Sequence, residues 1–430
     1  MSHGRKPTYL TPVAGGALRP WDMLVFNTMN PLRGKRILLG VSGSIAAYKA
    51  ALLVRLLVKA EAQVQVIMTE SATTFITPLT LATLSKRPAL MALVANSETG
   101  IWNNHVDLGL WADALVIAPA SARTLARCAH ALADDLLSAT YLSARCPVFV
   151  APAMDLDMYQ HPATRENLDR LRRFGNHIIS PGHGELASGL VGEGRLAEPE
   201  TIVQTLESHF GRQPGWVGKS VLITAGPTQE ALDPVRYISN HSTGKMGFAL
   251  ANAFALAGAE VTLVCGPTYL DTPRPGIRRV DVRSAQEMYE VAAAAFPAAH
   301  LTILNAAVAD YRPVEVASEK IKKKDSQISI DLTKTVDIAA TLGAQKRPDQ
   351  HMMGFALETT NERANALDKL RRKNLDWIVL NSLRDVGAGF GHDTNKITVI
   401  DRQETVLEFD LKTKEAVAHD LLTLVTATLC

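Results

Sequence analysis

A polar stretch punctuated by glycine, RYISNHSTGKMG, spans residues 236–247 and directly precedes an apolar run typical of a helix. Asn240 offers an amide that can both donate and accept, and Ser242, Thr243 and Gly244 offer short donors and a close backbone. Loops between regular elements carry a large share of the binding and catalytic residues in proteins. The stretch is therefore predicted to contact a ligand.

A second turn of small residues joins a predicted strand to a predicted helix near the start of the chain. In LGVSGSIAAYKA (residues 39–50), Gly43 and Ser44 stand at the junction. Small residues let the backbone approach a phosphate, and the following helix adds free N–H groups and a positive dipole end. The spacing differs from the GxGxxG fingerprint, and an ordinary strand-to-helix turn explains this stretch equally well when it is considered alone.

Three other groups have side chains suited to catalysis or to holding a charged ligand. His105 precedes a buried strand in NNHVDLGLWADALVIAPAS, although a lone histidine is more often structural. Asp155 lies in APAMDLDMYQHPAT, directly after a strand, where open α/β sheets bind ligands. The cluster EKIKKK (residues 319–324) contains four lysines, Lys320 among them, and is typical of a solvated basic loop when considered alone.

These candidates are joined by segments that alternate between strand and helix from Lys35 onward. Strands are predicted by short apolar runs such as RILLGVS, QVQVIMT, ALVIAPA and PVFVAPAM, and the longer stretches between them have a helical period. Such alternation is typical of βαβ units around a parallel sheet with helices on both faces. The segment FGRQPGWVGK interrupts the pattern at residues 210–219, and the pattern then restarts. A final segment, residues 395–422, predicts a hairpin and a closing helix.

We therefore predict the fold class α/β, with two tandem Rossmann-like domains at residues 35–210 and 211–430. Residues 1–34 form a Pro- and Gly-rich extension without periodicity. A transit peptide is one explanation of this extension; a loose tail, or an upstream start before Met29, is another.

The bulk properties restrict the class of protein. The chain has 430 residues, and its formal net charge of +2 is too small to indicate nucleic acid or an anionic membrane as the main partner. No uncharged apolar run reaches the roughly 18 residues that a membrane span needs. The four cysteines are scattered without a CxxC pair, which argues against a zinc site or a disulfide framework and favours a reducing cytoplasm.

The order of motifs in the first domain is GSIAAYK, a histidine before LGLWAD, APAS, and then PAMDLDMY. This order resembles the flavin-dependent cysteine decarboxylases over roughly residues 35–200. The resemblance implies an FMN phosphate on the SGSIA turn and a catalytic role for His105. The residues implied to lie at the flavin are Gly43, Ser44, Ile45, Ser121 and Ala122.

The chemistry of that family needs an electron sink, because a cysteine carboxylate that loses CO₂ leaves a carbanion without delocalisation. A flavin supplies the sink by oxidising the thiol transiently. Two positions depart from the family pattern. Asp155 stands where an Asn usually meets the substrate carboxylate, so that an ionised Asp would repel it and a protonated one would donate to it. Ser188 stands where a Cys helps to protonate the product, and a hydroxyl is a weaker acid than a thiol.

The second domain resembles phosphopantothenate–cysteine ligases over residues 218–430, from ITAGPTQEALDPVRYISNHSTGKMG through NAAVADYRP, EKIKKK, VDIAATL, GFALET and KLRRKNLD. The resemblance implies that CTP, screened by Mg²⁺, activates 4′-phosphopantothenate as an acyl-cytidylate, and that the amine of L-cysteine then displaces CMP. Asn240 is implied to hold the acyl-cytidylate and Lys320 to assist activation, while His241 is expected to position rather than catalyse. The implied nucleotide contacts are Asp310, Lys320, Val336, Asp337, Ile338, Ala339, Phe355, Lys369 and Lys373, the last two spaced i, i+4.

The resulting hypothesis is a bifunctional enzyme of coenzyme A synthesis that ligates cysteine and then decarboxylates the product to 4′-phosphopantetheine. One alternative is a ligase whose flavin domain only binds or assembles. A peptide-cysteine decarboxylase is another, but it leaves the second domain unexplained. The family resemblance also implies a homo-oligomer, with trimers through the flavin domain and dimers through the ligase domain, which together can build a dodecamer.

Overall fold

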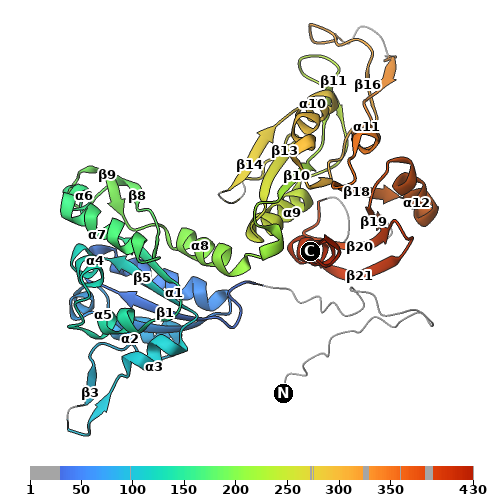
Figure 1. The fold of residues 1–430 in the computed structure, drawn as a ribbon. Helices are drawn as coiled ribbons and strands as arrows, with labels where there is room; N and C mark the ends of the chain where they lie inside the picture. Colours follow the sequence, from blue (N-terminus) through green and yellow to red (C-terminus); the bar gives the residue numbers. More distant parts are fainter. Residues whose placement is uncertain are drawn as a thin grey trace, which may run out of the picture. The chain divides into compact units, whose positions relative to one another are not determined.

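The computed structural model describes residues 30–96, 98–271, 274, 276–322, 329–358, 360–382 and 391–429. These residues divide into two compact units, Asn30–Phe210 and a second that begins at Gly211 (Figure 1). Most of the N-terminal extension, residues 1–29, lies outside the described residues, as do Lys323 and Lys324 of the basic cluster. The first unit begins a few residues before the predicted boundary at Lys35, because Leu32 is fully buried in its core.

The first unit is built on a five-stranded parallel sheet in the order β2-β1-β5-β6-β7. The strands of the whole unit, including the separate pairs β3–β4 and β8–β9, are β1 (Arg36–Val41), β2 (Gln63–Met68), β3 (Val94–Asn96), β4 (Ile101–Trp102), β5 (Ala114–Ala120), β6 (Val148–Pro152), β7 (His177–Ile178), β8 (Gly182–Glu185) and β9 (Val191–Arg195). Its helices are η2 (Ile45–Tyr48), α1 (Lys49–Lys59), η3 (Glu70–Thr74), α2 (Pro78–Ser85), α3 (His105–Trp111), α4 (Ala122–Ala129), α5 (Leu136–Ser143), α6 (Leu156–Gln160), α7 (Pro162–Arg173) and α8 (Pro199–Gly211).

Helices cover both faces of this sheet, because the central strands are buried on both sides. Side chains of α1, α2 and α8 form one core with the sheet, and those of α4, α5 and α7 form another. Strand β1 lies between β2 and β5, so the strand order reverses at its carboxyl end. Ligands of open α/β sheets bind at such a reversal.

The second unit contains an eight-stranded sheet in the order β14-β13-β10-β15-β18-β19-β20-β21. Its strands are β10 (Ser220–Ala225), β11 (Gln229–Ala231), β12 (Tyr237–Ser239), β13 (Glu260–Cys265), β14 (Ile277–Asp281), β15 (Leu301–Leu304), β16 (Tyr311–Pro313), β17 (Leu332–Lys334), β18 (His351–Glu358), β19 (Trp377–Ser382), β20 (Thr394–Asp401) and β21 (Val406–Thr413). Its helices are η4 (Pro214–Trp216), α9 (Lys245–Leu256), α10 (Ala285–Ala295), η5 (Phe296–Ala298), α11 (Ile338–Gln345), α12 (Glu362–Arg372) and α13 (Lys414–Leu429).

The sheet is parallel from β14 to β19, and the hairpin β20–β21 is added antiparallel to its edge (Figure 1). Helices α9 and α13 pack on one face, and α10, α11 and α12 pack on the other. The predicted α/β class is confirmed, including the C-terminal hairpin and its closing helix. Within the described segments, no helix is long and apolar enough to cross a membrane.

Candidate functional sites

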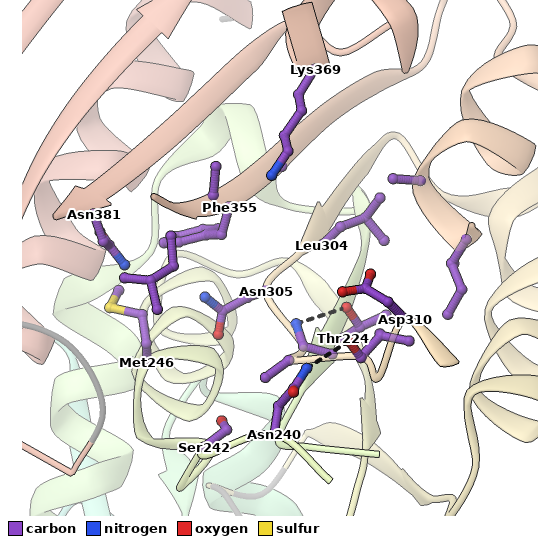
Figure 2. Close-up of a pocket in the computed structure, with 18 of the residues that line it drawn as sticks. Thr224, Asn240, Ser242, Met246, Leu304, Asn305, Asp310, Phe355, Lys369 and Asn381 are labelled. Atoms are coloured by element: carbon purple, nitrogen blue, oxygen red, sulfur yellow. Dashed lines mark hydrogen bonds between the residues drawn. The ribbon is translucent and has the colours of Figure 1, made fainter. Parts of the chain in front are cut away.

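A cavity of about 840 Å³ opens in the second unit at the carboxyl ends of β10, β15 and β18 (Figure 2). Strand β10 lies between β13 and β15, so this is the point where the strand order of the larger sheet reverses. Cavities of this volume hold ligands of drug or cofactor size. The cavity is therefore the candidate ligand site of the second unit.

The motif that follows β12 forms one wall of the cavity. Residues 240–246 all line it, and the Asn240 amide donates from Nδ2 to the Val308 carbonyl oxygen at 2.8 Å (Figure 2). Gly244 has a φ of +79°, which favours glycine, and it leads directly into α9. Its N–H donates to Ser242 Oγ at 3.3 Å. The loop thus presents the Asn240 amide and the N-terminus of α9 to the same cavity.

Two lysines line another part of the cavity, and each is paired with a carboxylate. Lys369 and Lys373 lie one turn apart at the end of α12 and both face the cavity. Lys369 Nζ lies 2.6 Å from Glu358 Oε1, and Lys373 Nζ lies 2.9 Å from Asp337 Oδ1. Burial would raise the pKa of Asp337, but the hydrogen bond from Lys373 and that from the Ala340 N–H hold it below its ordinary value. This part of the wall therefore carries two ammonium groups, each held in place by a carboxylate.

Most of the remaining residues assigned to the nucleotide also line this cavity. Val336, Asp337, Ile338 and Ala339 do so at the start of α11, where Asp337 caps the helix. Phe355 of β18 presents a half-buried ring, and Asp310 lies on the lining just before β16.

Lys320 is placed differently from the other predicted residues. Its side chain is exposed, and it is not among the residues that line the cavity. It makes no hydrogen bond or ion pair with any described residue. The loop that carries it is attached to the turn between β11 and β12, because Asp233 and Arg236 both hydrogen-bond to the Ile321 backbone.

Several polar residues of the cavity were not assigned an individual role from the sequence. Asn381, Asn395, Lys245 and Lys414 all line it. Lys414 is 5% exposed, and its ammonium donates to the His392 carbonyl oxygen. Burial, and then the charge of Lys245, lower the pKa of Lys414. Asn381 could have been found as a polar residue at the carboxyl end of an apolar strand, whereas Asn395 and Lys414 carry no local signal.

In the first unit, Ser42 connects the two segments predicted to hold a flavin. Its hydroxyl donates to the Pro119 carbonyl oxygen at 2.7 Å and accepts from the Ser121 N–H at 2.8 Å. Ser121 caps α4, which begins at Ala122, and Ser44 caps η2, which begins at Ile45. Two helical N-termini therefore lie together at the reversal between β1 and β5, and both present N–H groups suited to an anion.

The turn after β1 has the close packing that a phosphate cradle requires. A Cβ added at Gly43 would meet the Ser71 side chain at 2.4 Å, so only glycine fits there without a shift. The free backbone at this turn, with the hydroxyl of Ser44 beside it, fits the phosphate of a flavin nucleotide. This position relative to the sheet is also the one that open α/β folds use for FMN.

The other predicted residues of the first unit lie on separate elements. His105 is the first residue of α3; its Nδ1 is buried and has no hydrogen-bond partner among the described atoms. Asp155 is half-buried at the start of α6, and its side chain makes no capping bond. The hairpin β8–β9 contacts this segment, since the Met154 N–H donates to the Gly194 carbonyl oxygen at 3.0 Å. Ser188 is exposed in the turn of that hairpin.

No group of three or more His, Cys, Asp or Glu side chains within the described residues is arranged to hold a metal ion.

Both units match known protein families. Residues 26–211 match the family model described as Flavoprotein, and residues 216–429 match the DNA/pantothenate metabolism flavoprotein C-terminal domain. A cysteine/cysteine sulfinic acid decarboxylase of an unknown prokaryotic organism is 55% identical over 351 residues, which cover 81% of this chain and 98% of that protein.

Two bifunctional proteins of coenzyme A biosynthesis are similar along nearly their whole length. CoaBC of Bacillus subtilis (strain 168) is 43% identical over 393 residues, covering 91% of this chain and 96% of that protein. CoaBC of Escherichia coli (strain K12) is 46% identical over 369 residues, covering 85% and 90%. The chain therefore belongs to the family of bifunctional coenzyme A biosynthesis proteins, which combine a flavoprotein decarboxylase domain with a ligase domain.

Proposed function

We propose that the second unit joins L-cysteine to 4′-phosphopantothenate at the expense of CTP. The observation that carries this proposal is the single cavity that brings together the Asn240 amide, the N-terminus of α9 and the two lysines of α12. A triphosphate and a phosphorylated acid are both highly charged, and such a site neutralises them with cations and directed donors.

The reaction has two steps. In the first, the carboxylate of 4′-phosphopantothenate attacks the α-phosphorus of CTP, which forms an acyl-cytidylate and releases pyrophosphate. In the second, the cysteine amine attacks the acyl carbon, which forms the amide and releases CMP. Lys369 and Lys373 are suited to the nucleotide phosphates, Phe355 to packing against the base, and Asn240 to holding the acyl-cytidylate. Lys245 and Lys414 are suited to the second anionic group, the phosphate of 4′-phosphopantothenate.

This proposal is tested by supplying CTP, Mg²⁺ and 4′-phosphopantothenate without cysteine. Pyrophosphate release should then be limited to about one equivalent per site, and CMP release should follow only when cysteine is added. Equal rates with ATP and CTP would contradict the assigned nucleotide. Absence of pyrophosphate release with either nucleotide would contradict the proposed reaction.

We further propose that the first unit binds FMN at Gly43, Ser44, Ile45, Ser121 and Ala122 and decarboxylates the cysteine product to 4′-phosphopantetheine. FMN supplies the two-electron sink that the loss of CO₂ requires. The protein supplies the phosphate turn tied by Ser42, the imidazole of His105 for proton transfer, and the half-buried carboxyl of Asp155 near the base of the β8–β9 hairpin.

A second candidate for the first unit is decarboxylation of free cysteine or cysteine sulfinate. It is favoured by the 55% identical relative named for these substrates, and by Asp155 and Ser188 in place of the Asn and Cys of the resembled family. Release of CO₂ from 4′-phosphopantothenoylcysteine, cysteine and cysteine sulfinate, measured side by side, separates the two candidates. Turnover of only the small substrates would overturn the proposed second step of coenzyme A synthesis.

We also propose that the protein is a homo-oligomer in the cytoplasm. Ile45, Tyr48 and Leu52 are exposed along η2 and α1, and an apolar stripe of this kind suits contact with a second copy of the unit. Sedimentation of the intact protein, compared with a variant that carries Tyr48→Glu, tests whether this stripe supports assembly.

A further inference from the structure

Asp233 is a buried carboxylate in the turn between β11 and β12. Its side chain is 0% exposed. Oδ1 accepts from the N–H groups of Val235 and Arg236, both at 2.8 Å, and Oδ2 accepts from the N–H of Ile321 at 3.1 Å. Burial would raise the pKa of this carboxyl, but the three backbone hydrogen bonds and the charge of Arg236 hold it below its ordinary value. Asp233 is therefore an ionised group with both oxygens in use.

The two oxygens serve different purposes. Oδ1 completes a local turn, which an Asn side chain closes equally well. Oδ2 reaches a residue 88 positions away in the sequence, next to Lys320. The turn needs only one acceptor, Oδ1. The second acceptor, Oδ2, is needed only for the bond to the loop at Ile321, and this bond explains why a carboxylate stands here.

The backbone of Ile321 is held on both sides. Its N–H donates to Asp233, and its carbonyl oxygen accepts from Arg236 Nη2 at 3.1 Å. Arg236 Nη1 lies 3.5 Å from Asp233 Oδ2, so the two side chains also pair with each other. A third bond, from the Ala317 N–H to the Leu232 carbonyl oxygen at 3.1 Å, fixes the start of the same loop.

The other end of this hairpin enters the cavity. Strand β12 ends at Ser239, and the next residue is Asn240, whose amide is tied to Val308 on the cavity wall. The β11–β12 hairpin therefore holds the backbone beside Lys320 and also positions Asn240. The few residues from Arg236 to Asn240 therefore connect the backbone beside Lys320 to the Asn240 amide, and both Lys320 and Asn240 are assigned to the ligation.

We propose that Asp233 is a positioning residue for the activation step, and that it acts by fixing the backbone from which Lys320 reaches the bound nucleotide. The inference rests on the proposed function, and on the role that the family resemblance implies for Lys320, which is to assist the activation step. The Lys320 side chain is long, exposed and without a described partner, so its position is set mainly by its backbone. A displaced catalytic group loses rate steeply, by about a hundredfold for a shift of roughly 1 Å.

Asp233→Asn is a selective test. The Asn side chain keeps an acceptor for the turn, but its amide NH₂ faces the Ile321 N–H, donor against donor. Single-turnover pyrophosphate release from CTP and 4′-phosphopantothenate should slow by about tenfold to a hundredfold, with a much smaller change in the KM for CTP. Asp401→Asn is the matched control, because Asp401 closes the β20–β21 turn by accepting from Gln403 and Thr405 N–H and makes no such distant bond.

The route through Lys320 is tested by combining variants. Lys320→Gln alone should slow activation, and the double variant with Asp233→Asn should be no slower than Lys320→Gln. Hydrogen exchange should rise at residues 317–322 in Asp233→Asn and stay unchanged there in Asp401→Asn. If Asp233→Asn does not fold, Arg236→Met removes the bond to the Ile321 carbonyl and should give the same loss and the same lack of additivity.

The outcomes separate the two proposals. A wild-type enzyme that releases no pyrophosphate overturns the proposed ligation, and the exchange measurement alone then decides whether Asp233 fixes the loop. An active wild type with Asp233→Asn at an unchanged rate overturns the positioning role. Losses that multiply in the double variant also overturn it, because they show that Asp233 does not act through Lys320.

Discussion

Lys373 Nζ lies 2.9 Å from Asp337 Oδ1, and this ion pair joins the end of α12 to the N-cap residue of α11 on the wall of the cavity. The same carboxylate caps α11 by accepting from the Ala340 N–H at 3.0 Å. Asp337 therefore orients the ammonium while it fixes the helix, and the stretch from Val336 to Ala339 is held beside a positive charge.

Lys373→Met should weaken the binding of CTP. The ammonium is one of the charge-assisted donors suited to its phosphates, and the loss of one such contact corresponds to about a tenfold to hundredfold rise in the KM for CTP. Initial rates of ligation at varied CTP measure this. Arg371→Met is the control, since Arg371 lies on the same helix but pairs with Glu404 and is not among the cavity-lining residues. An equal effect in both variants would contradict a specific role for Lys373.

Asn240→Asp should allow the acyl-cytidylate to form but slow its reaction with cysteine. The amide donates to the Val308 carbonyl oxygen, and a carboxylate cannot donate there and adds a negative charge beside a phosphorylated intermediate. We expect the second step to fall by about a hundredfold or more. Mass spectrometry of quenched reactions should show the accumulated intermediate, and its absence despite normal pyrophosphate release would refute the assignment.

Ser44→Asp should remove the flavin from the first unit. Its side chain stands at the turn that would hold the phosphate, and a carboxylate there repels it at close range. We expect at least about a tenfold loss of affinity, measured as the visible absorbance of the purified protein. Thr201→Asp places the same charge in an exposed first turn of α8 and should keep the colour. A yellow Ser44→Asp protein would remove the phosphate-turn assignment.

Asp155→Asn should preserve or raise the release of CO₂ from 4′-phosphopantothenoylcysteine, because an amide donates to a substrate carboxylate in every protonation state. Ser188→Cys should speed the final protonation and reduce the amount of enethiol released, since a thiol is the stronger acid. Both are followed by CO₂ trapping and by chromatography of the products. A loss of activity in Asp155→Asn would show that the carboxyl is required in its own right.

Asp376 should make the stability of the second unit depend on pH. Burial would raise its pKa, but the nearby His351 imidazole and the hydrogen bonds from Lys346 and the Met352 N–H lower it below the ordinary value. A lowered folded pKa means that the stabilisation is present above the ordinary carboxyl value and is lost as the pH falls below about 4. Chemical unfolding of the wild type should therefore weaken steeply in acid, and Asp376→Asn should flatten that slope.

Asp376→Ala should lower the free energy of unfolding at neutral pH by about 3 kcal/mol, since it leaves the Lys346 ammonium buried and unpaired. Lys346 is 5% exposed at its side chain, so water cannot replace the lost partner. Asp349→Ala, which breaks an exposed pair with Arg347, should change stability little. If Asp376→Ala and Asp349→Ala lowered the free energy of unfolding equally, burial of the Asp376–Lys346 pair would not explain the effect.

The fold could be predicted from the sequence because each central strand is a continuous apolar run between longer periodic segments. RILLGVS gives β1, ALVIAPA gives β5, and the alternating segment after Thr394 gives β20 and β21. The short antiparallel pairs β8–β9 and β16–β17 were not predicted, because three to five residues with glycine or charge leave no period to detect.

The sequence predicted those residues of the candidate site that lie in recognisable local motifs. It did not predict the residues that distant elements bring to the cavity. Asn240 and Asp337 stand beside small or capping residues, and the sequence therefore marks them as loop and helix-start positions. Lys414 reaches the same cavity from the last helix, and Asn395 from an edge strand, only because the sheet folds them there. The place of Lys320 outside the cavity lining also depends on Asp233, a long-range contact that no local pattern encodes.

Ser42 uses its hydroxyl as a donor to Pro119 and as an acceptor from Ser121. Neither alanine nor cysteine can replace both bonds with good geometry, so the turn after β1 and the start of α4 depend on one oxygen atom for their alignment. Transplanting the SGSIA turn alone into another α/β sheet would therefore not transfer flavin affinity. The graft has to include the segment after β5 as well. In protein design, these two distant stretches therefore have to be transferred together.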